Sequence, residues 1–258
     1  MALLKLNNVS RSFGGLSAVS DINIEIEDNQ LVGIIGPNGA GKTTLFNLLT
    51  GVYKPSKGTI ELLIDGKMKQ IQGKSPHEIT ALGLARTFQN IRLFKGMPVL
   101  NNVKAAMHKE NKAGLISTLL RTSRFYDEER RIEEEAIELL KLVGLEEEKD
   151  ELASNLPYGK QRRLEIARAL ATHPKILFLD EPAAGMNPHE TEELTALIHL
   201  IKEKFHLTII LIEHDMSLVM RLCEKIFVLD YGICIAQGTP QQIQNNPKVI
   251  KAYLGEDE

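Results

Sequence analysis

Gly36-Pro-Asn-Gly-Ala-Gly41-Lys42-Thr43 is the most informative segment of this 258-residue chain, because it matches the pattern G-x-x-x-x-G-K-[ST] in full. It lies between an apolar run at 31–35 and a helical pattern at 44–49. Glycines let a backbone curl until several N–H groups point inward at phosphate oxygens. The N-terminus of the following helix attracts the same anion. The sequence therefore predicts a strand, a phosphate-binding loop and a helix in succession.

The residue types in this loop indicate a site for a magnesium–nucleotide complex. Lys42 is expected to reach the β- and γ-phosphates, and the Thr43 hydroxyl is expected to ligate Mg²⁺. A chance glycine-rich turn is the alternative, but such a turn needs neither a buried strand before it nor a helix after it. The predicted nucleotide-binding residues are consecutive: Gly36, Pro37, Asn38, Gly39, Ala40, Gly41, Lys42, Thr43 and Thr44.

Two adjacent carboxylates, Asp180 and Glu181, follow the apolar run 176–179. Asp180 is predicted to hold Mg²⁺ through bound waters, and Glu181 to act as the general base that polarises the attacking water. Apolar strands often end in acids, so this pattern alone is weak evidence. The phosphate loop on the same chain is what gives it weight.

Three further side chains are informative only in combination. Gln89 lies where strand patterns give way to helical ones, and we expect it to contact both Mg²⁺ and the helical block; alone it would be interpreted as a surface-loop residue. His214 follows an apolar run, at the strand end where α/β proteins place their sites. Phe13 precedes a glycine pair and is expected to stack on a nucleotide base, the alternative being a core residue.

Different regions of the chain show different patterns of apolar and charged residues. The strict alternation in Ile22–Glu27 predicts a half-buried strand, and Asp65-Gly66 predicts a hairpin turn. From 101 to 152 apolar residues recur at helical spacing among charged ones, with no strand pattern. We therefore predict an α/β core formed by residues 1–86 and 164–238, a helical subdomain at 87–163 and a helical C-terminal tail at 239–258.

Bulk composition excludes several classes of protein. The net charge of −3 gives no reason to expect a nucleic-acid partner. No run approaches the ~18 consecutive apolar residues that a membrane-spanning helix needs. The N-terminal MALLKLNNVS lacks the basic and apolar regions of a signal peptide. We therefore expect a cytoplasmic protein that reaches a membrane only through partners.

A second helix start that suits an anion is predicted at Leu156-Pro-Tyr-Gly159-Lys-Gln161-Arg-Arg163. With this segment, nearly the whole chain resembles the nucleotide-binding subunit of an ABC (ATP-binding cassette) transporter. The diagnostic order is phosphate loop, Q-loop Gln89, signature motif, Walker B acids, D-loop Asn187 and switch His214. The resemblance implies an α/β fold: a P-loop NTPase (RecA-like) core with an N-terminal antiparallel β part and an inserted helical subdomain.

The resemblance also implies an ATPase with ATP and Mg²⁺ at its site and with Lys42, Glu181 and His214 in catalysis. Metal contacts fall to Thr43, Gln89 and Asp180. In that family ATP lies between the phosphate loop of one subunit and the signature motif of another. The helical block docks on transmembrane permease subunits, which places the protein on the inner face of the cell membrane. A second cassette, or a second copy of this chain, is implied as partner, and an extracytoplasmic binding protein indirectly.

The signature motif departs from the family's usual L-S-G-G-Q. Pro157 replaces the serine and supplies neither a hydroxyl nor an N–H. Tyr158 replaces the first glycine, Gly159 is retained, and Lys160, followed by Gln161, stands where the glutamine usually is. Asn187 stands in place of the D-loop aspartate. The composite site that uses this motif is therefore expected to bind phosphate with fewer hydrogen bonds, which favours a heterodimer.

Several strings resemble the branched-chain amino-acid uptake group of that family: ARTFQNIRLF, YGKQRRLEIARAL, EPAAGMNP, IEHDM and VIKAYLGE. Cassettes for urea, amides or lipopolysaccharide export share much of this wording and remain alternatives for the cargo. A soluble ABC ATPase that acts on ribosomes or in DNA repair usually carries two cassettes or a long coiled-coil insertion. A metabolic P-loop kinase would not need the segment 156–163 or the strand-end His214.

Overall fold

The computed structural model describes residues 2–107 and 123–254, so parts of the predicted helical subdomain and tail, 108–122 and 255–258, lie outside the described residues. The strands are β1 Ala2–Phe13, β2 Leu16–Glu27, β3 Leu31–Ile35, β4 Lys57–Ile64, β5 Lys67–Gln70, β6 Leu84–Arg86, β7 Ile176–Asp180, β8 Thr208–Ile212, β9 Lys225–Asp230 and β10 Ile233–Gly238. The helices are α1 Lys42–Leu49, α2 Pro76–Ala81, α3 Val99–Met107, α5 Ser123–Leu142, α6 Tyr158–Leu170, α7 Pro188–Phe205, α8 Met216–Leu222, α9 Pro240–Gln244 and α10 Pro247–Leu254.

The larger sheet has the strand order β10-β9-β3-β8-β7-β6, and all neighbours from β9 to β6 run parallel. Its inner strands β3, β8 and β7 are buried throughout and covered on both faces. In β3, for example, Val32 and Ile34 belong to one buried cluster, whereas Leu31 and Ile35 belong to the other. This arrangement explains the unbroken apolar runs, since a parallel strand with two covered faces has no need for alternation. The carboxyl ends of β3, β6, β7 and β8 meet at one edge, where the site lies.

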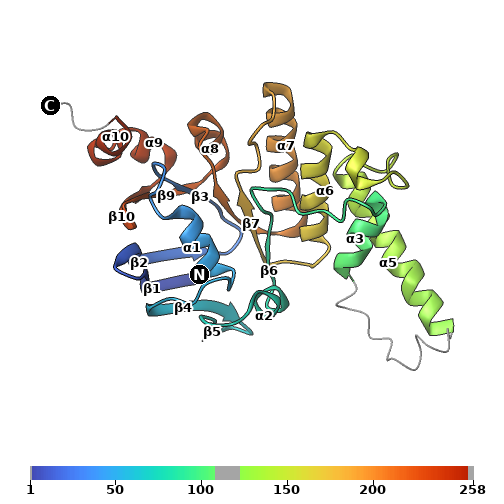
Figure 1. The fold of residues 1–258 in the computed structure, drawn as a ribbon, viewed down its shortest axis with the longest axis horizontal. Coiled ribbons are helices and arrows are strands. Elements are labelled where there is room, and N and C mark those ends of the chain that lie inside the picture. Colours follow the sequence, from blue (N-terminus) through green and yellow to red (C-terminus); the bar gives the residue numbers. More distant parts are fainter. Residues whose placement is uncertain (1, 108–122, 255–258) are drawn as a thin grey trace.

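The second sheet is antiparallel, with the order β2-β1-β4-β5, and confirms the predicted N-terminal β part (Figure 1). In β2 the three isoleucines of the alternating segment are buried and their neighbours are exposed. Asp65 and Gly66 have φ angles of 53° and 74°, as a two-residue hairpin turn requires. A shared apolar cluster that includes Leu45 and Phe46 joins this sheet and the larger one to α1. Helix α1, which follows the phosphate loop, is thus held in place by contacts with both sheets.

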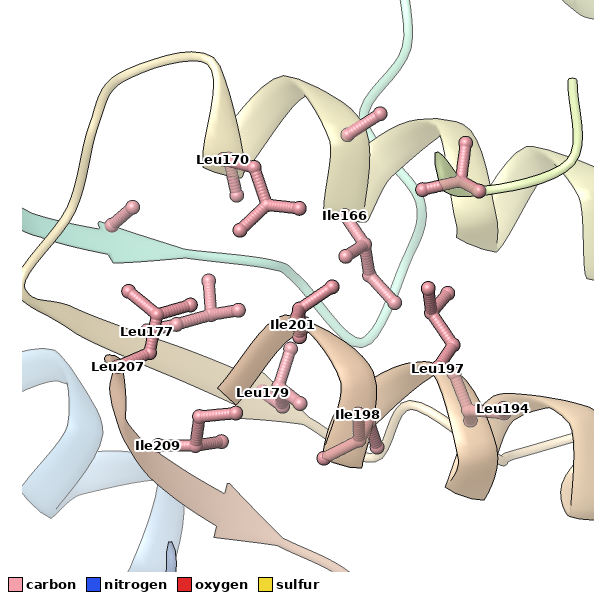
Figure 2. Close-up of a cluster of buried hydrophobic side chains, with 14 of the residues drawn as sticks. Ile166, Leu170, Leu177, Leu179, Leu194, Leu197, Ile198, Ile201, Leu207 and Ile209 are labelled. Atoms are coloured by element: carbon pink, nitrogen blue, oxygen red, sulfur yellow. The ribbon is translucent and has the colours of Figure 1, made fainter. Parts of the chain in front are cut away.

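The core beneath β7 fixes the strand that carries the two predicted acids. Figure 2 shows Leu177 and Leu179 of β7 among side chains of α6, α7 and β8. Each fully buried side chain of this size contributes about 1.5–3 kcal/mol relative to an exposed one. The partners in this cluster are Ile166, Leu170, Leu194, Leu197, Ile198, Ile201, Leu207 and Ile209. This packing therefore holds the carboxyl end of β7, where the two acids lie, in a fixed position.

The helical block, α3 and α5 with the first half of α6, lies at the far end of the molecule from the antiparallel sheet (Figure 1). In α5 the residues at helical spacing, such as Ile132, Ala136 and Leu140, are buried, and most of the acidic and basic residues between them are exposed. The predicted boundary at 163/164 falls inside α6, which runs from the block into the core cluster beside β7. One helix therefore belongs to both regions.

The tail begins with α9, whose N-cap Thr239 accepts a hydrogen bond from the backbone N–H of Gln242. The described part of the tail is helical, as predicted, since α9 ends at Gln244 and α10 begins at Pro247. Within residues 2–107 and 123–254, no helix combines the length and apolarity needed to cross a membrane.

Candidate functional site: the phosphate-loop cleft

The phosphate loop joins β3 to α1, and its glycines are required by its shape. Gly36, Gly39 and Gly41 have φ angles of 151°, 82° and 98°, which L side chains rarely adopt. A Cβ at Gly36 would lie 2.0 Å from the carbonyl oxygen of Leu229, and one at Gly41 would lie 2.5 Å from that of Ala18. The curl predicted from the sequence is thus enforced by neighbouring backbone.

Lys42 lies inside this curl. Its Nζ donates hydrogen bonds to the carbonyl oxygens of Gly36 at 2.7 Å and Pro37 at 2.9 Å. Burial lowers the pKa of Lys42, while the nearby carboxylate of Glu181 acts in the opposite direction. Thr43 follows at the start of α1 and is exposed. Residues 38–44 line a cleft of about 560 Å³, together with Gln89, Glu181 and His214 from more distant parts of the chain.

Gln89, Glu181 and His214 form a contiguous cluster at the edge of this cleft. Gln89 Nε2 donates to Glu181 Oε2 at 2.8 Å, and His214 Nε2 shares a hydrogen bond with Glu181 Oε1 at 2.7 Å. The three residues follow β6, β7 and β8, which are neighbours in the sheet. Glu181 has a φ angle of 46°, a conformation that costs a non-glycine residue about 1–2 kcal/mol. The structure thus brings together residues that the sequence separates by up to 125 positions (214 − 89).

Asp180 ends β7 and is buried. Its Oδ2 accepts a hydrogen bond of 2.6 Å from Arg86 Nη2, at the end of β6. The other terminal nitrogen of Arg86 donates to Asn47 Oδ1 and Thr50 Oγ1, in and just after α1. Arg86 therefore links the strand-end acid to the helix that follows the phosphate loop. The sequence interpretation missed it; the available signal was a charged residue three positions before Gln89.

The predicted metal contacts of Thr43, Asp180 and Gln89 fit Mg²⁺ by donor type, since a hydroxyl, a carboxylate and an amide all offer oxygen. Mg²⁺ usually takes one or two carboxylates and completes its shell with waters and substrate phosphates. In the part of the chain that the structure describes, no group of three or more His, Cys, Asp or Glu residues could hold a metal by itself. The residues thus fit an ion held jointly with a nucleotide.

Phe13 does not line the phosphate-loop cleft. Its ring packs edge-on against Tyr53, with centroids 5.2 Å apart, and the guanidinium of Arg11 lies 4.6 Å from its centroid. At 39% exposure Phe13 is not a core residue either. Leu16 and Tyr231 line the end of the cleft instead. Base stacking by Phe13 therefore stays a prediction.

The signature segment lies apart from this cleft, at the start of α6. Pro157 is the N-cap of α6 and makes no side-chain capping bond. Tyr158 is 44% exposed, and its Oη accepts a hydrogen bond of 3.3 Å from Arg162. Lys160 pairs with Glu148, and Gln161 Nε2 donates to the Leu156 carbonyl at 2.8 Å. The polar side chains of this segment are thus engaged within the chain.

Asn187 is the N-cap of α7. Its Oδ1 accepts from the backbone N–H of Glu190, and the Glu190 carboxylate accepts from the backbone N–H of Asn187, both at 3.0 Å. The same carboxylate packs on the signature turn, because a Cβ at Gly159 would lie 2.8 Å from Glu190 Oε1. The predicted D-loop residue and the signature turn therefore share one neighbour.

Comparison with known proteins identifies the family. A family model described as ABC transporter matches residues 19–184, which contain the phosphate loop, Gln89, the signature segment and both acids. The chain belongs to the ABC transporter family. A second model, described as branched-chain amino acid ATP-binding cassette transporter, matches residues 234–258.

The chain matches similar proteins over almost all of its length. It is 50% identical over 258 residues to the high-affinity branched-chain amino acid transport ATP-binding protein LivG of Escherichia coli (strain K12), with 98% of each chain covered. It is 48% identical to the protein named BraF, with the same description, of Pseudomonas aeruginosa, again with 98% of each covered. Among solved structures, the ADP conformation of MJ1267, an ATP-binding cassette of an ABC transporter, matches with 31% identity and a TM-score of 0.83 over 99% of this chain and all of that one. The expected fold and enzyme class, an ATPase coupled to transport, are confirmed.

Charged residues buried around the cassette's site escaped the sequence interpretation. Glu213 directly follows β8, and its carboxylate accepts from the backbone N–H groups of Ala183 and His214. Burial raises the pKa of Glu213. Arg162 and Glu165, on α6, form a buried ion pair of 2.8 Å. The available signal for the pair was an Arg and a Glu at i,i+3 in the helix that was predicted after the signature motif.

Proposed function

We propose that this cassette binds and hydrolyses Mg-ATP in the phosphate-loop cleft, on the cytoplasmic side of a membrane, to drive uptake of leucine, isoleucine and valine. The observation that carries the ATPase site is the convergence of Gln89 and His214 on the two carboxylate oxygens of Glu181. The cargo rests on the named relatives and on the match of residues 234–258.

The residues divide the chemistry of hydrolysis between them. Lys42 exchanges its bonds to loop carbonyls for bonds to the β- and γ-phosphates. Thr43, Asp180 and Gln89 would hold Mg²⁺, which would neutralise phosphate charge. Glu181 accepts a proton from the attacking water, and His214 holds that carboxylate in place through Oε1. Because Gln89 occupies Oε2 in this structure, its withdrawal from Glu181 would free that oxygen for water.

Permease subunits are the proposed partners, and we expect them to bind in a groove next to the loop that carries Gln89. A hollow of about 570 Å³ lies between the core and the helical block. Its wall carries arginines stacked on aromatic rings: Arg92 lies 4.1 Å from the Phe88 centroid, and Arg168 lies 4.8 Å from that of Phe94. Phe94 is 50% exposed. A permease segment bound here would contact the loop that carries Gln89. A second cassette completes the pair of ATP sites, and an extracytoplasmic binding protein delivers the cargo.

Uptake measurements test the cargo. A strain that lacks this chain should lose high-affinity uptake of leucine, isoleucine and valine, and the wild-type chain should restore it. The Glu181→Gln variant, expressed at the same level, should not, because transport requires hydrolysis. Normal leucine uptake together with a defect for urea, an amide or lipopolysaccharide export would move the cassette to another branch of the family.

A further inference from the structure

A buried ion pair on α6 grips the loop that carries Gln89. Arg162 is fully buried and donates to the carbonyl oxygens of Phe88 at 2.6 Å and Gln89 at 2.9 Å. Glu165 accepts from the backbone N–H groups of Phe88 at 3.1 Å and Arg92 at 3.3 Å. The Arg162–Glu165 clamp therefore satisfies both donors and acceptors of this one loop.

The same guanidinium also touches the two motifs on either side. Arg162 Nη2 donates to Tyr158 Oη in the signature segment at 3.3 Å and lies 3.5 Å from the carbonyl oxygen of Glu181. Arg162 thus joins the first turn of α6 to the backbone of Gln89 and of Glu181. The side chains of those two residues meet in the cleft at 2.8 Å.

Stability alone is a poor reason for a clamp of this kind. Burying a charged pair costs desolvation energy, and apolar residues of similar volume often stabilise a fold as well or better. The Nε–H of Arg162 also finds no acceptor among the described residues, which adds to the cost. What an arginine supplies is geometry, since two separate nitrogens of its planar fork bond the Phe88 and Gln89 carbonyls in fixed directions, whereas a lysine would have to bond both from a single nitrogen.

We propose that Arg162 is a positioning residue that fixes Gln89 and Glu181 relative to the first turn of α6, so that a displacement of the signature turn reaches the water-activating carboxylate. The inference rests on the proposed roles of Gln89 and Glu181. It assigns no contact with ATP to Arg162 itself. Its consequence is that Arg162 affects the rate of the chemical step and leaves nucleotide affinity unchanged.

Turnover of the full transporter in proteoliposomes tests this. Arg162→Lys should lower kcat about 10–100-fold, because misplacement by ~1 Å is enough for such a loss, and should leave the KM for ATP within about twofold. Arg221→Lys, at an exposed arginine in the last turn of α8, should keep wild-type kcat. Unchanged turnover in Arg162→Lys, or a rise in KM that accounts for the whole loss, would overturn the proposal.

A double variant separates positioning from folding. Arg162→Met with Glu165→Met removes both charges together, so no buried ion is left unpaired. The backbone groups of Phe88, Gln89 and Arg92 lose their partners, so the melting temperature should fall, and kcat is compared well below the melting temperature of the variant. Its kcat should still fall at least as far as that of Arg162→Lys. Wild-type kcat in this variant would show that the clamp is structural only.

The Glu181→Gln variant, measured alongside, distinguishes two kinds of failure. Loss of turnover in Glu181→Gln with normal turnover in Arg162→Lys contradicts only the positioning role. Normal turnover in Glu181→Gln contradicts the proposed site, and the positioning role with it.

Discussion

The phosphate-loop cleft and the signature turn are both predicted to face phosphate, yet their polar groups are arranged in opposite ways. In the cleft, the side chains of Lys42, Gln89, Glu181 and His214 are also bonded within the chain, but all four line one cavity. At the signature turn, Lys160 and Gln161 turn back to partners in the chain, and Pro157 offers no donor. We therefore propose that the cleft carries the catalytic residues and that the signature turn of this chain is a weaker phosphate-binding site. A cassette built this way contributes its catalytic residues to one composite site and a reduced signature to the other, which fits the proposed heterodimer.

The strongest test of the catalytic side is Glu181→Gln. The substitution keeps the size of the side chain but removes the base, so turnover should fall about 10²–10⁴-fold while ATP still binds. Steady-state phosphate release and equilibrium ATP binding give the two numbers. Glu203→Gln, an exposed carboxylate on α7, is the matched control. Turnover near the wild-type rate would mean that the cleft is not the catalytic region. The contrast between the cleft and the signature turn would then have no functional meaning.

The signature side is tested by Pro157→Ser, which restores the family's usual hydroxyl. One added hydrogen bond to a charged acceptor is worth about 1.5–3 kcal/mol, or roughly 10–150-fold in affinity at each composite site. Because a homodimer gains this bond at both of its sites, its dimerisation constant should tighten by at least that factor. Sedimentation in the Glu181→Gln background, where ATP persists, measures the dimerisation constant. Serine also suits the uncapped N-terminus of α6 and should raise monomer stability by about 0.5–2 kcal/mol.

Pro157→Ala separates the contributions to that result, because alanine restores the backbone N–H without the hydroxyl. A serine variant that dimerises no better than the alanine variant would assign the gain to the backbone. If neither variant dimerises more tightly than the wild type, the proline is a tolerated substitution and the proposed asymmetry has no basis in this motif.

How much could be predicted from the sequence depends on how far apart along the chain the interacting residues lie. The phosphate loop is local, so its glycine spacing was sufficient. The cluster around Glu181 is distant in sequence but was still predictable, because the carboxyl ends of neighbouring parallel strands must meet at one edge. The contacts of Arg86 and Arg162 were not predictable. They span 94 and 73 positions and depend on which of many possible acceptors a long side chain reaches.

The position of Phe13 shows the same limit. The packing of Phe13 on Tyr53 depends on how the β1–β2 hairpin folds over the loop after α1, which no spacing pattern encodes. The predicted boundary at 163/164 is a different case, because it lies inside α6. The helix already begins after Pro157, and a proline before a helix was a usable signal.

The smallest expected effect concerns Asn187, which stands where the family has an aspartate. Its role within this chain is to cap α7, and an aspartate would cap equally well, so Asn187→Asp should leave both stability and homodimer turnover nearly unchanged. Asn187→Ala should lose about 1 kcal/mol, which for a chain of this size lowers the melting temperature by about 2–4 °C. Thermal melts with and without ATP measure both changes. A gain of tenfold or more in the turnover of Asn187→Asp would contradict this, because it would show that residue 187 directly limits the composite ATP site. The part of the cassette that weakens this site would then include the start of α7 as well as the signature turn.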